Sequence, residues 1–361
     1  MAVYIPLVEG QDIITDDANK VTTGFFEGGV GTVTGHNLTT SSLSTTQKNY
    51  YYNLQYSSKD HISVTYGHIG GSGSDSVTNV VGETETIYKQ FANYLLNPIN
   101  TNDGDSVTEG FQFVSGTLVT DCYFLSFERA KMKDRMNKKN WTLWLSGSAS
   151  TASVSGAQTT IKLTDDSEYT EGTDTVVGKR YNIVSGTLGT RADTRPYGWF
   201  YPDVGIMVLN AKTSGSGILD LSASLGGSTG FVTSGSGDPN ATWGNGLAPD
   251  LDNDGTPDNA WKLAIAMIKG DQTFRSEEDQ TTKSYFCRAK APNFNFSNNP
   301  TFTSGSDNEY QNPTFEGNPQ SFITTVGLYD SSQTLVAVGR LSKPIKKNFS
   351  SEAVIKVNLT Y

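Results

Sequence analysis

The chain has 361 residues, a net charge of −10 and only 18% charged residues. This acidic balance would repel a phosphate backbone, which argues against nucleic acid as a partner. No apolar run approaches the ~20 residues that cross a bilayer. No basic segment precedes an apolar run near Met1, so we expect no signal peptide and no membrane partner. We expect a soluble protein, synthesised in the cytoplasm.

The composition predicts a mostly β fold. Thr, Tyr and Phe suit a pleated surface, Gly and Asn supply turns, and 17 Tyr, 17 Phe and 5 Trp provide aromatic burial. We expect β-sandwich-like domains with long Gly/Ser-rich loops and one or two short helices. The chain is expected to divide into an N-terminal β segment, a central β domain, a loop excursion and a C-terminal β segment: 1–110, 111–221, 222–260 and 261–361.

The first segment is predicted to contain two strands and the clearest helix of the chain. Residues 50–56 and 61–66 have high β-propensity and alternate. A helix is predicted over 85–96 and ends before Pro98. Its apolar residues are expected to share one face: Ile87, Phe91, Tyr94 and Leu95.

The rest of the chain is predicted as strands broken by turns. In the central domain the expected strands are 111–114, 122–127, 141–145, 160–164, 181–184, 205–209 and 218–221. In the C-terminal segment they are 261–268, 284–289, 322–329, 335–338 and 353–361. The last run alternates up to Tyr361, whereas chain ends usually fray. We therefore expect the C-terminus to belong to a sheet.

The residues that most often carry catalysis are scarce. The three His residues, His36, His61 and His68, form no known metal or nucleophile signature. Cys122 and Cys287 are expected to be reduced and buried, because two thiols do not make a disulfide framework. The chain is therefore expected not to be an enzyme.

One acidic loop has the spacing of a calcium site. The oxygens of Asp250, Asp252 and Asp254, the carbonyl of Thr256 and the acid Asp258 match the first part of a calcium loop. Trp261 stands where an EF-hand has its bidentate acid, so the match is to a short acidic loop of the thrombospondin-repeat kind. The alternatives are an occupied calcium site, which would stiffen the loop, and a plain solvated turn. No other cofactor is expected.

A cluster of basic residues stands out in an acidic chain. If residues 127–135 form a strand, four cations share one face: Arg129, Lys131, Lys133 and Arg135. Such a face could bind an acidic neighbouring subunit. If the segment forms a helix instead, the charges spread around it. The alternative to a binding role is a solvated surface without a partner.

Several blocks of the sequence resemble one protein family. The C-terminal blocks are Phe322 to Tyr329, Leu335 to Lys347 and Ala353 to Leu359; others are 11–16, 63–68, 88–91, 129–133, 140–141, 181–186 and 201–205. Together they resemble a family of virion structural proteins from large contractile-tailed phages, cyanophages especially. The 250–258 loop lies outside every block, so the resemblance does not bear on calcium.

The resemblance implies a subunit of the virion tail or baseplate, located in the particle and without catalytic residues. A position in the baseplate wedge is the preferred expectation. Its partners would be other tail and baseplate subunits, in several copies of a symmetric assembly. The alternatives are a receptor-binding fibre or adhesin and a capsid-surface binding protein, which more often show repeats or a fibrous stalk. A secreted glycan hydrolase is disfavoured because the chain lacks a catalytic signature.

Overall fold

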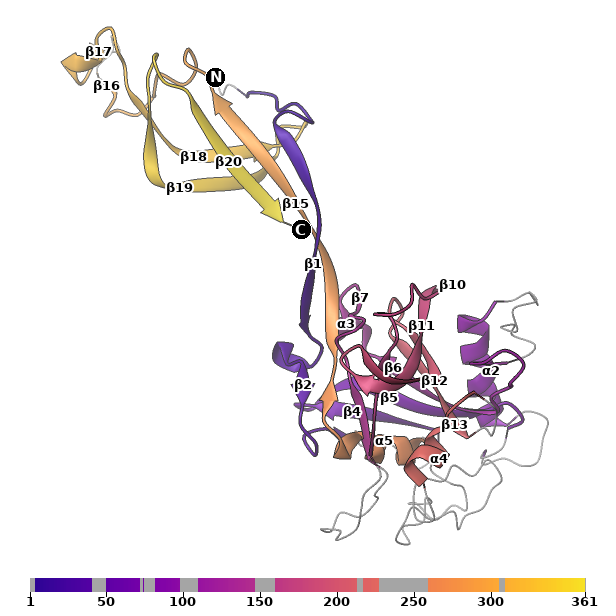
Figure 1. The fold of residues 1–361 in the computed structure, drawn as a ribbon. Coiled ribbons are helices and arrows are strands. Elements are labelled where there is room, and N and C mark those ends of the chain that lie inside the picture. The colour runs from indigo at the N-terminus through magenta and orange to yellow at the C-terminus, as the bar shows by residue number, and fades with distance from the viewer. Residues whose placement is uncertain are drawn as a thin grey trace. The chain divides into compact units, whose positions relative to one another are not determined.

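The computed structural model describes residues 4–40, 50–71, 74, 82–97, 110–146, 160–212, 217–226, 259–304 and 309–360. The mostly β fold predicted from the composition is confirmed. The contacts divide the chain into two units (Figure 1): unit 1 is residues 1–20 with 279–361, and unit 2 is residues 21–278. Unit 1 thus combines both ends of the chain, a different grouping from the four consecutive segments expected. Two long strands contribute residues to both units: β1 (Ile13–Gly24) and β15 (Arg275–Ala289).

Unit 2 is built on a ten-stranded antiparallel sheet. In spatial order its strands are β3 (Thr39–Thr40), β4 (Tyr51–Tyr56), β5 (Lys59–His68), β6 (Asp121–Phe127), β13 (Ile206–Lys212), β12 (Thr190–Tyr201), β11 (Gly178–Thr187), β9 (Thr160–Asp165) and β8 (Leu143–Ser146). The tenth strand, β10 (Thr173–Thr175), pairs with β11. Most of these strands are predicted from the sequence, because their β-branched and aromatic residues lie between turn residues.

Helices and loops cover both faces of this sheet. On one face α4 (Leu221–Gly226) and α5 (Asn259–Lys269) pack on a cluster that includes Tyr123 and Leu125. On the other face α2 (Glu83–Leu95) and residues 110–119 pack on a cluster that includes Cys122 and Phe124. Since neighbouring side chains of β6 point to opposite faces, burial of both faces explains its almost uninterrupted apolar sequence.

The central region contains three errors of sequence prediction. Residues 261–268 form helix α5 and not a strand, because Leu263, Ala264 and Met267 repeat at helical spacing among good helix formers. The strand predicted over 218–221 is also wrong: the segment is irregular up to Leu221, where α4 begins. Residues 111–114 form no strand, and only Val114 makes an isolated bridge.

The predicted helix is confirmed as α2, but only some of the residues expected on its buried face are fully buried. Tyr94 is half exposed, and Ile87 and Phe91 are only partly buried. The fully buried positions are Thr84, Tyr88, Ala92 and Leu95. Phe91 still contacts the sheet, because its ring stacks on that of Phe124 at 4.1 Å between centroids.

Short elements complete unit 2. They are a 3₁₀ turn at Glu27–Gly29, α3 (Arg129–Met132), and the small strands β2 (Thr32–Val33), β7 (Arg135–Met136) and β14 (Gln272–Thr273). Strand β2 pairs with β14, and β7 pairs with β15 at Ser276 and Glu277. Thus the N-terminal residues of β15 pair with a strand of unit 2.

Unit 1 consists of small sheets with few strands. One has the order β1–β15–β20, where β20 is Ala353–Thr360. A second is the hairpin of β18 (Ser321–Tyr329) and β19 (Leu335–Lys347). Two smaller strands, β16 (Thr303–Ser304) and β17 (Glu309–Tyr310), pair with each other, and a 3₁₀ turn spans Pro313–Phe315. The predicted C-terminal strand is confirmed, since β20 pairs with β15 through Thr360.

Candidate interaction surface

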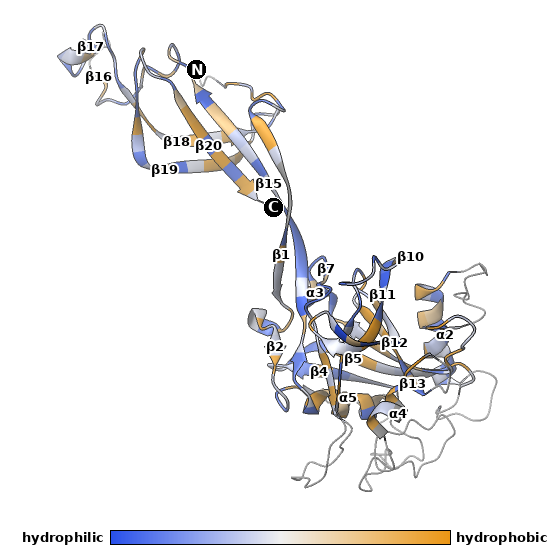
Figure 2. Cartoon of the chain, in the orientation of Figure 1, coloured by the Kyte–Doolittle hydropathy of each residue, from blue (hydrophilic) through white to orange (hydrophobic). Residues whose placement is uncertain are grey.

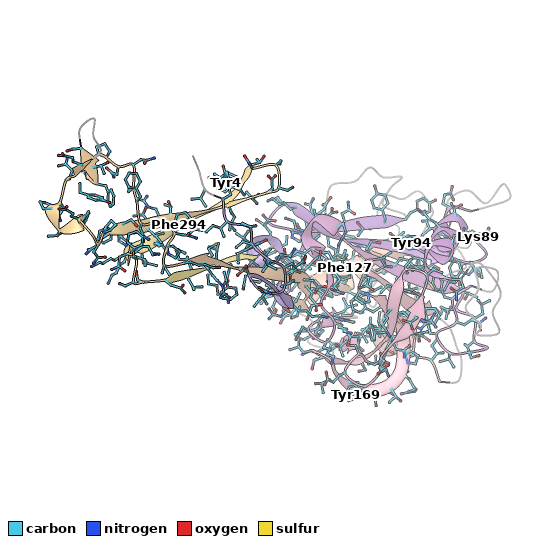
Figure 3. The ribbon with its side chains drawn as sticks, turned by 90° about the horizontal axis from the view of Figure 1, so that it is seen from above. Tyr4, Lys89, Tyr94, Phe127, Tyr169 and Phe294 are labelled. Atoms are coloured by element: carbon cyan, nitrogen blue, oxygen red, sulfur yellow. The ribbon has the colours of Figure 1, made fainter. Side chains whose placement is uncertain are left out.

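Unit 1 exposes more large hydrophobic side chains than it buries. Among the described residues it contains fourteen of the large hydrophobic side chains that are exposed, whereas the longer unit 2 contains five. The buried hydrophobic residues in the described part of unit 1 number only five: Ala289, Phe302, Leu328, Ala353 and Ile355. Figure 3 shows the side chains of this unit, among them those of Tyr4 and Phe294, which are exposed. Single exposed apolar residues are normal, but a concentration of them indicates an interaction site.

The longest exposed apolar surface follows the β18–β19 hairpin. Every even-numbered position of β19 from 336 to 346 is exposed, as period-2 geometry requires of one face. The register pairs Val338 with Gly327 and Arg340 with Thr325, and it pairs Lys346 with Phe322 beyond a register shift between Ile323 and Thr325. Directly paired residues of an antiparallel ladder share a face. We define the outer face as the exposed side chains on the two sides of this shift: Val336, Val338 and Arg340 on one side, and Phe322 and Lys346 on the other.

The outer face is apolar and basic. Phe322, Val336 and Val338 are 58%, 63% and 60% exposed. Neither β18 nor β19 contains Asp or Glu. Lys343 is also exposed, and within the described residues neither it nor Arg340 or Lys346 forms an ion pair. Figure 2 shows how hydrophobic and hydrophilic positions alternate along the strands of unit 1.

The basic cluster predicted from the sequence lies elsewhere, in unit 2. Its cationic side chains already form hydrogen bonds or ion pairs within the chain. Arg129 donates to the backbone carbonyls of Lys133 and Asp134. The other cations form ion pairs with acids of the same chain: Lys131 with Glu27, Lys133 with Glu278, and Arg135 with Glu277. Of the two alternatives for this segment, the structure shows the helical one for Arg129–Met132, and Lys133 has a positive φ of 59°. A contact of this cluster with another subunit stays a prediction.

Glu27 links this cluster to His61. Hydrogen bonds from Lys131 and Lys59 lower the pKa of Glu27 to about 2. The backbone N–H of Glu27 donates to Nε2 of His61 over 2.9 Å, and Nδ1 of His61 lies 2.7 Å from the carbonyl oxygen of Lys59. Burial lowers the pKa of His61. The neutral ring therefore links the backbone at Glu27 to the backbone at Lys59 through hydrogen bonds.

A second polar cluster joins β5 to β6. The hydroxyls of Tyr66 and Thr120 donate to the two carboxylate oxygens of Asp121 over 2.6 and 2.7 Å. Nε2 of His68 lies 3.8 Å from the same carboxylate. Burial raises the pKa of Tyr66, so its hydroxyl keeps its proton and serves as a donor. The arrangement anchors neighbouring strands.

The remaining sequence predictions concern cysteines and calcium. Both cysteines are free: Cys122 is buried, as expected, but Cys287 is only half-buried. The residues of the calcium loop, Asp250 to Asp258, lie outside the described residues. Within the ranges that the structure describes, no group of three His, Cys, Asp or Glu side chains is placed to hold a metal ion. Calcium binding stays a prediction.

Comparisons with protein-family models, curated proteins and solved structures find no match to this chain. In the described part of the chain, no helix combines the length and apolar character needed to span a bilayer. The candidate site is therefore argued from the exposed surface of unit 1.

The sequence of β19 contains a feature from which the outer face could have been predicted. The segment 335–347 begins with the apolar run Leu335 to Val338, continues with four cations and lacks acids. Only its first four residues are predicted as a strand, because Gly339 and Pro344 interrupt the β pattern. Treated as one strand of thirteen residues, it would have predicted the exposed basic face.

Proposed function

We propose that the chain is a structural subunit of a phage virion, and that it belongs to the baseplate of a contractile tail, in the wedge region. In this role it works through protein–protein interfaces and catalyses no reaction. Its partners are other tail and baseplate subunits, present in several copies. The resemblance of its sequence blocks to a family of tailed-phage virion proteins supports this proposal.

The observation that carries the proposal is the imbalance between exposed and buried apolar residues in unit 1. Each large hydrophobic side chain that moves from water into an interface contributes roughly 1.5–3 kcal/mol. Of the residues that the structure describes, unit 1 buries five hydrophobic side chains and leaves fourteen large ones exposed. Contact with a neighbouring subunit would supply the burial that this unit lacks by itself. Unit 2, by contrast, has two buried apolar clusters of its own.

Antibody labelling of purified virions tests the proposal. Antibodies raised against unit 2 would be applied to particles of the virus that encodes the chain and viewed by electron microscopy. We expect label at the tail end distant from the capsid, and the chain in the protein content of gradient-purified particles. A chain found in infected cells but missing from purified virions contradicts a structural role. Label confined to fibre tips or the capsid instead supports the adhesin or capsid-surface alternative.

A further inference from the structure

We propose that the outer face of the β18–β19 hairpin docks an acidic protein surface that has an apolar centre. This inference rests on the proposed function, because it names the site and the chemistry of one partner. The occupant is a different subunit and not a second copy of the same face.

The first argument is the charge of the face. Arg340 and Lys346 of the outer face and the neighbouring Lys343 are exposed, and β18 and β19 contain no acid that could neutralise them. In the described residues these three side chains have no ion pair, unlike the cations of the 129–135 cluster. Potentials across a specific interface are complementary. The partner must therefore supply carboxylates.

The second argument excludes the face itself as its own partner. In a two-fold contact the same patch lies on both subunits. Arg340 and Lys346 would then meet the cations of the second copy, and like charges brought together across an interface oppose association. An interface of this face with itself would also leave every cation without an acid.

The third argument concerns the class of partner, and it favours a protein over a nucleic acid. Val336 and Val338 lie beside Arg340 on the same strand face and are more than half exposed. Aliphatic side chains gain from burial against apolar protein surface. Single-stranded nucleic acids are held by stacking of successive bases on aromatic side chains, and Phe322 is the one aromatic residue of the outer face. The net charge of −10 also repels a phosphate backbone. The composition of the face favours a protein.

The size of the face fits the centre of an interface. Strands of 9 and 13 residues extend up to about 43 Å at roughly 3.3 Å per residue, and two strands are about 10 Å wide. The resulting area, on the order of 400 Å², is about half of the roughly 800 Å² that one partner contributes to a stable interface. Further contacts from elsewhere on the chain would complete it.

Photo-cross-linking in infected cells tests the inference. Benzoylphenylalanine would replace Val338 in one variant and Phe322 in another. Val176, which is 57% exposed in unit 2, is the matched control position for Val338. We expect both test positions to cross-link to the same protein, at an acidic segment identified by mass spectrometry, and the control position to give no such product.

Charge reversal in the Val338 cross-linking variant provides the second measurement. The double substitution Arg340→Glu and Lys346→Glu should lower the cross-link yield at least tenfold, while Lys179→Glu in unit 2 should leave it unchanged. Circular dichroism would verify that each variant is folded. A product with a second copy, a product with nucleic acid, no product above the control, or a yield insensitive to charge reversal would each overturn the inference. Whether the cross-linked protein occurs in purified virions tests the proposed function separately.

Discussion

A buried lysine is expected to hold unit 1 together. Lys347 ends β19 and is fully buried, and its ammonium donates to three acceptors. These are the carbonyl oxygens of Ala291 and Asn348 and the side-chain oxygen of Asn295, each within 2.9 Å. Lys347→Met keeps the length of the side chain but removes all three hydrogen bonds. The exposed neighbour Lys346 provides a matched control, Lys346→Met.

The expected loss of stability in Lys347→Met follows from the three acceptors that lose their hydrogen-bond donor. A buried acceptor without a partner costs about 1–3 kcal/mol. Two of the three belong to residues that are only partly buried, so water can replace part of the loss, and removal of the buried charge offsets another part. We expect a net loss of about 2 kcal/mol in the stability of this part of unit 1.

Hydrogen exchange measures this loss locally. Amides that exchange through opening of the 290–296 segment should exchange about 30-fold faster in Lys347→Met, since 2 kcal/mol corresponds to roughly that factor. Peptides from the main sheet of unit 2 should be unchanged. Equal exchange in the variant and the original chain, or an equal effect of Lys346→Met, would refute the reasoning.

Three further predictions concern unit 2 and the acidic loop. The pKa of Glu27 in the folded chain, about 2, lies below its ordinary value of 4.5, so its stabilising contribution is complete above pH 4.5 and disappears as the pH falls through 2. Urea unfolding should therefore show that Glu27→Gln destabilises the chain at pH 6 but less at pH 3, while Glu171→Gln shows no such pattern. Gly198→Ala should lower the melting temperature by about 6–12 °C, or about 3 kcal/mol, because a Cβ there would lie 1.9 Å from the carbonyl oxygen of Val208. Gly339→Ala, whose Cβ meets nothing closer than 3.8 Å, should melt like the original chain. If the 250–258 loop binds calcium, a chelator should lower the melting temperature, and Asp252→Ala should abolish that response; an equal response in both chains argues for a plain turn.

Local pattern predicted strands well where a strand has turn residues at both ends. Strands β4, β5 and β6 are examples, because their β-branched and aromatic residues lie between polar turns. The same reasoning failed for α5, because a run of eight mostly apolar residues has the length of a buried strand. The helical spacing of Leu263, Ala264 and Met267 is hard to recognise within such a run.

Pairing between distant segments could not be predicted from local pattern. Strand β15 pairs with β20 about seventy residues later, and its neighbour on the other side is β1 from the start of the chain. No local feature of Arg288 indicates that its guanidinium meets Asp12. The same limit explains why the ion pairs of the basic cluster in unit 2 could not be predicted from the sequence.

The cations at 129–135 are conspicuous in the sequence. In the fold, acids from residues 27, 277 and 278, which are distant in sequence from this cluster, form ion pairs with three of them.

The cations of β19 can serve two purposes in an assembly protein. An exposed apolar strand such as 335–347 is liable to pair with other chains, and natural proteins limit this with charged residues on exposed strands. Arg340, Lys343 and Lys346 would keep free copies of the chain apart by mutual repulsion, because they form no ion pair within the described residues. The same repulsion ends when an acidic partner supplies the missing carboxylates. A subunit of this kind would remain separate until it meets its neighbour, and its apolar side chains would become buried only in that contact.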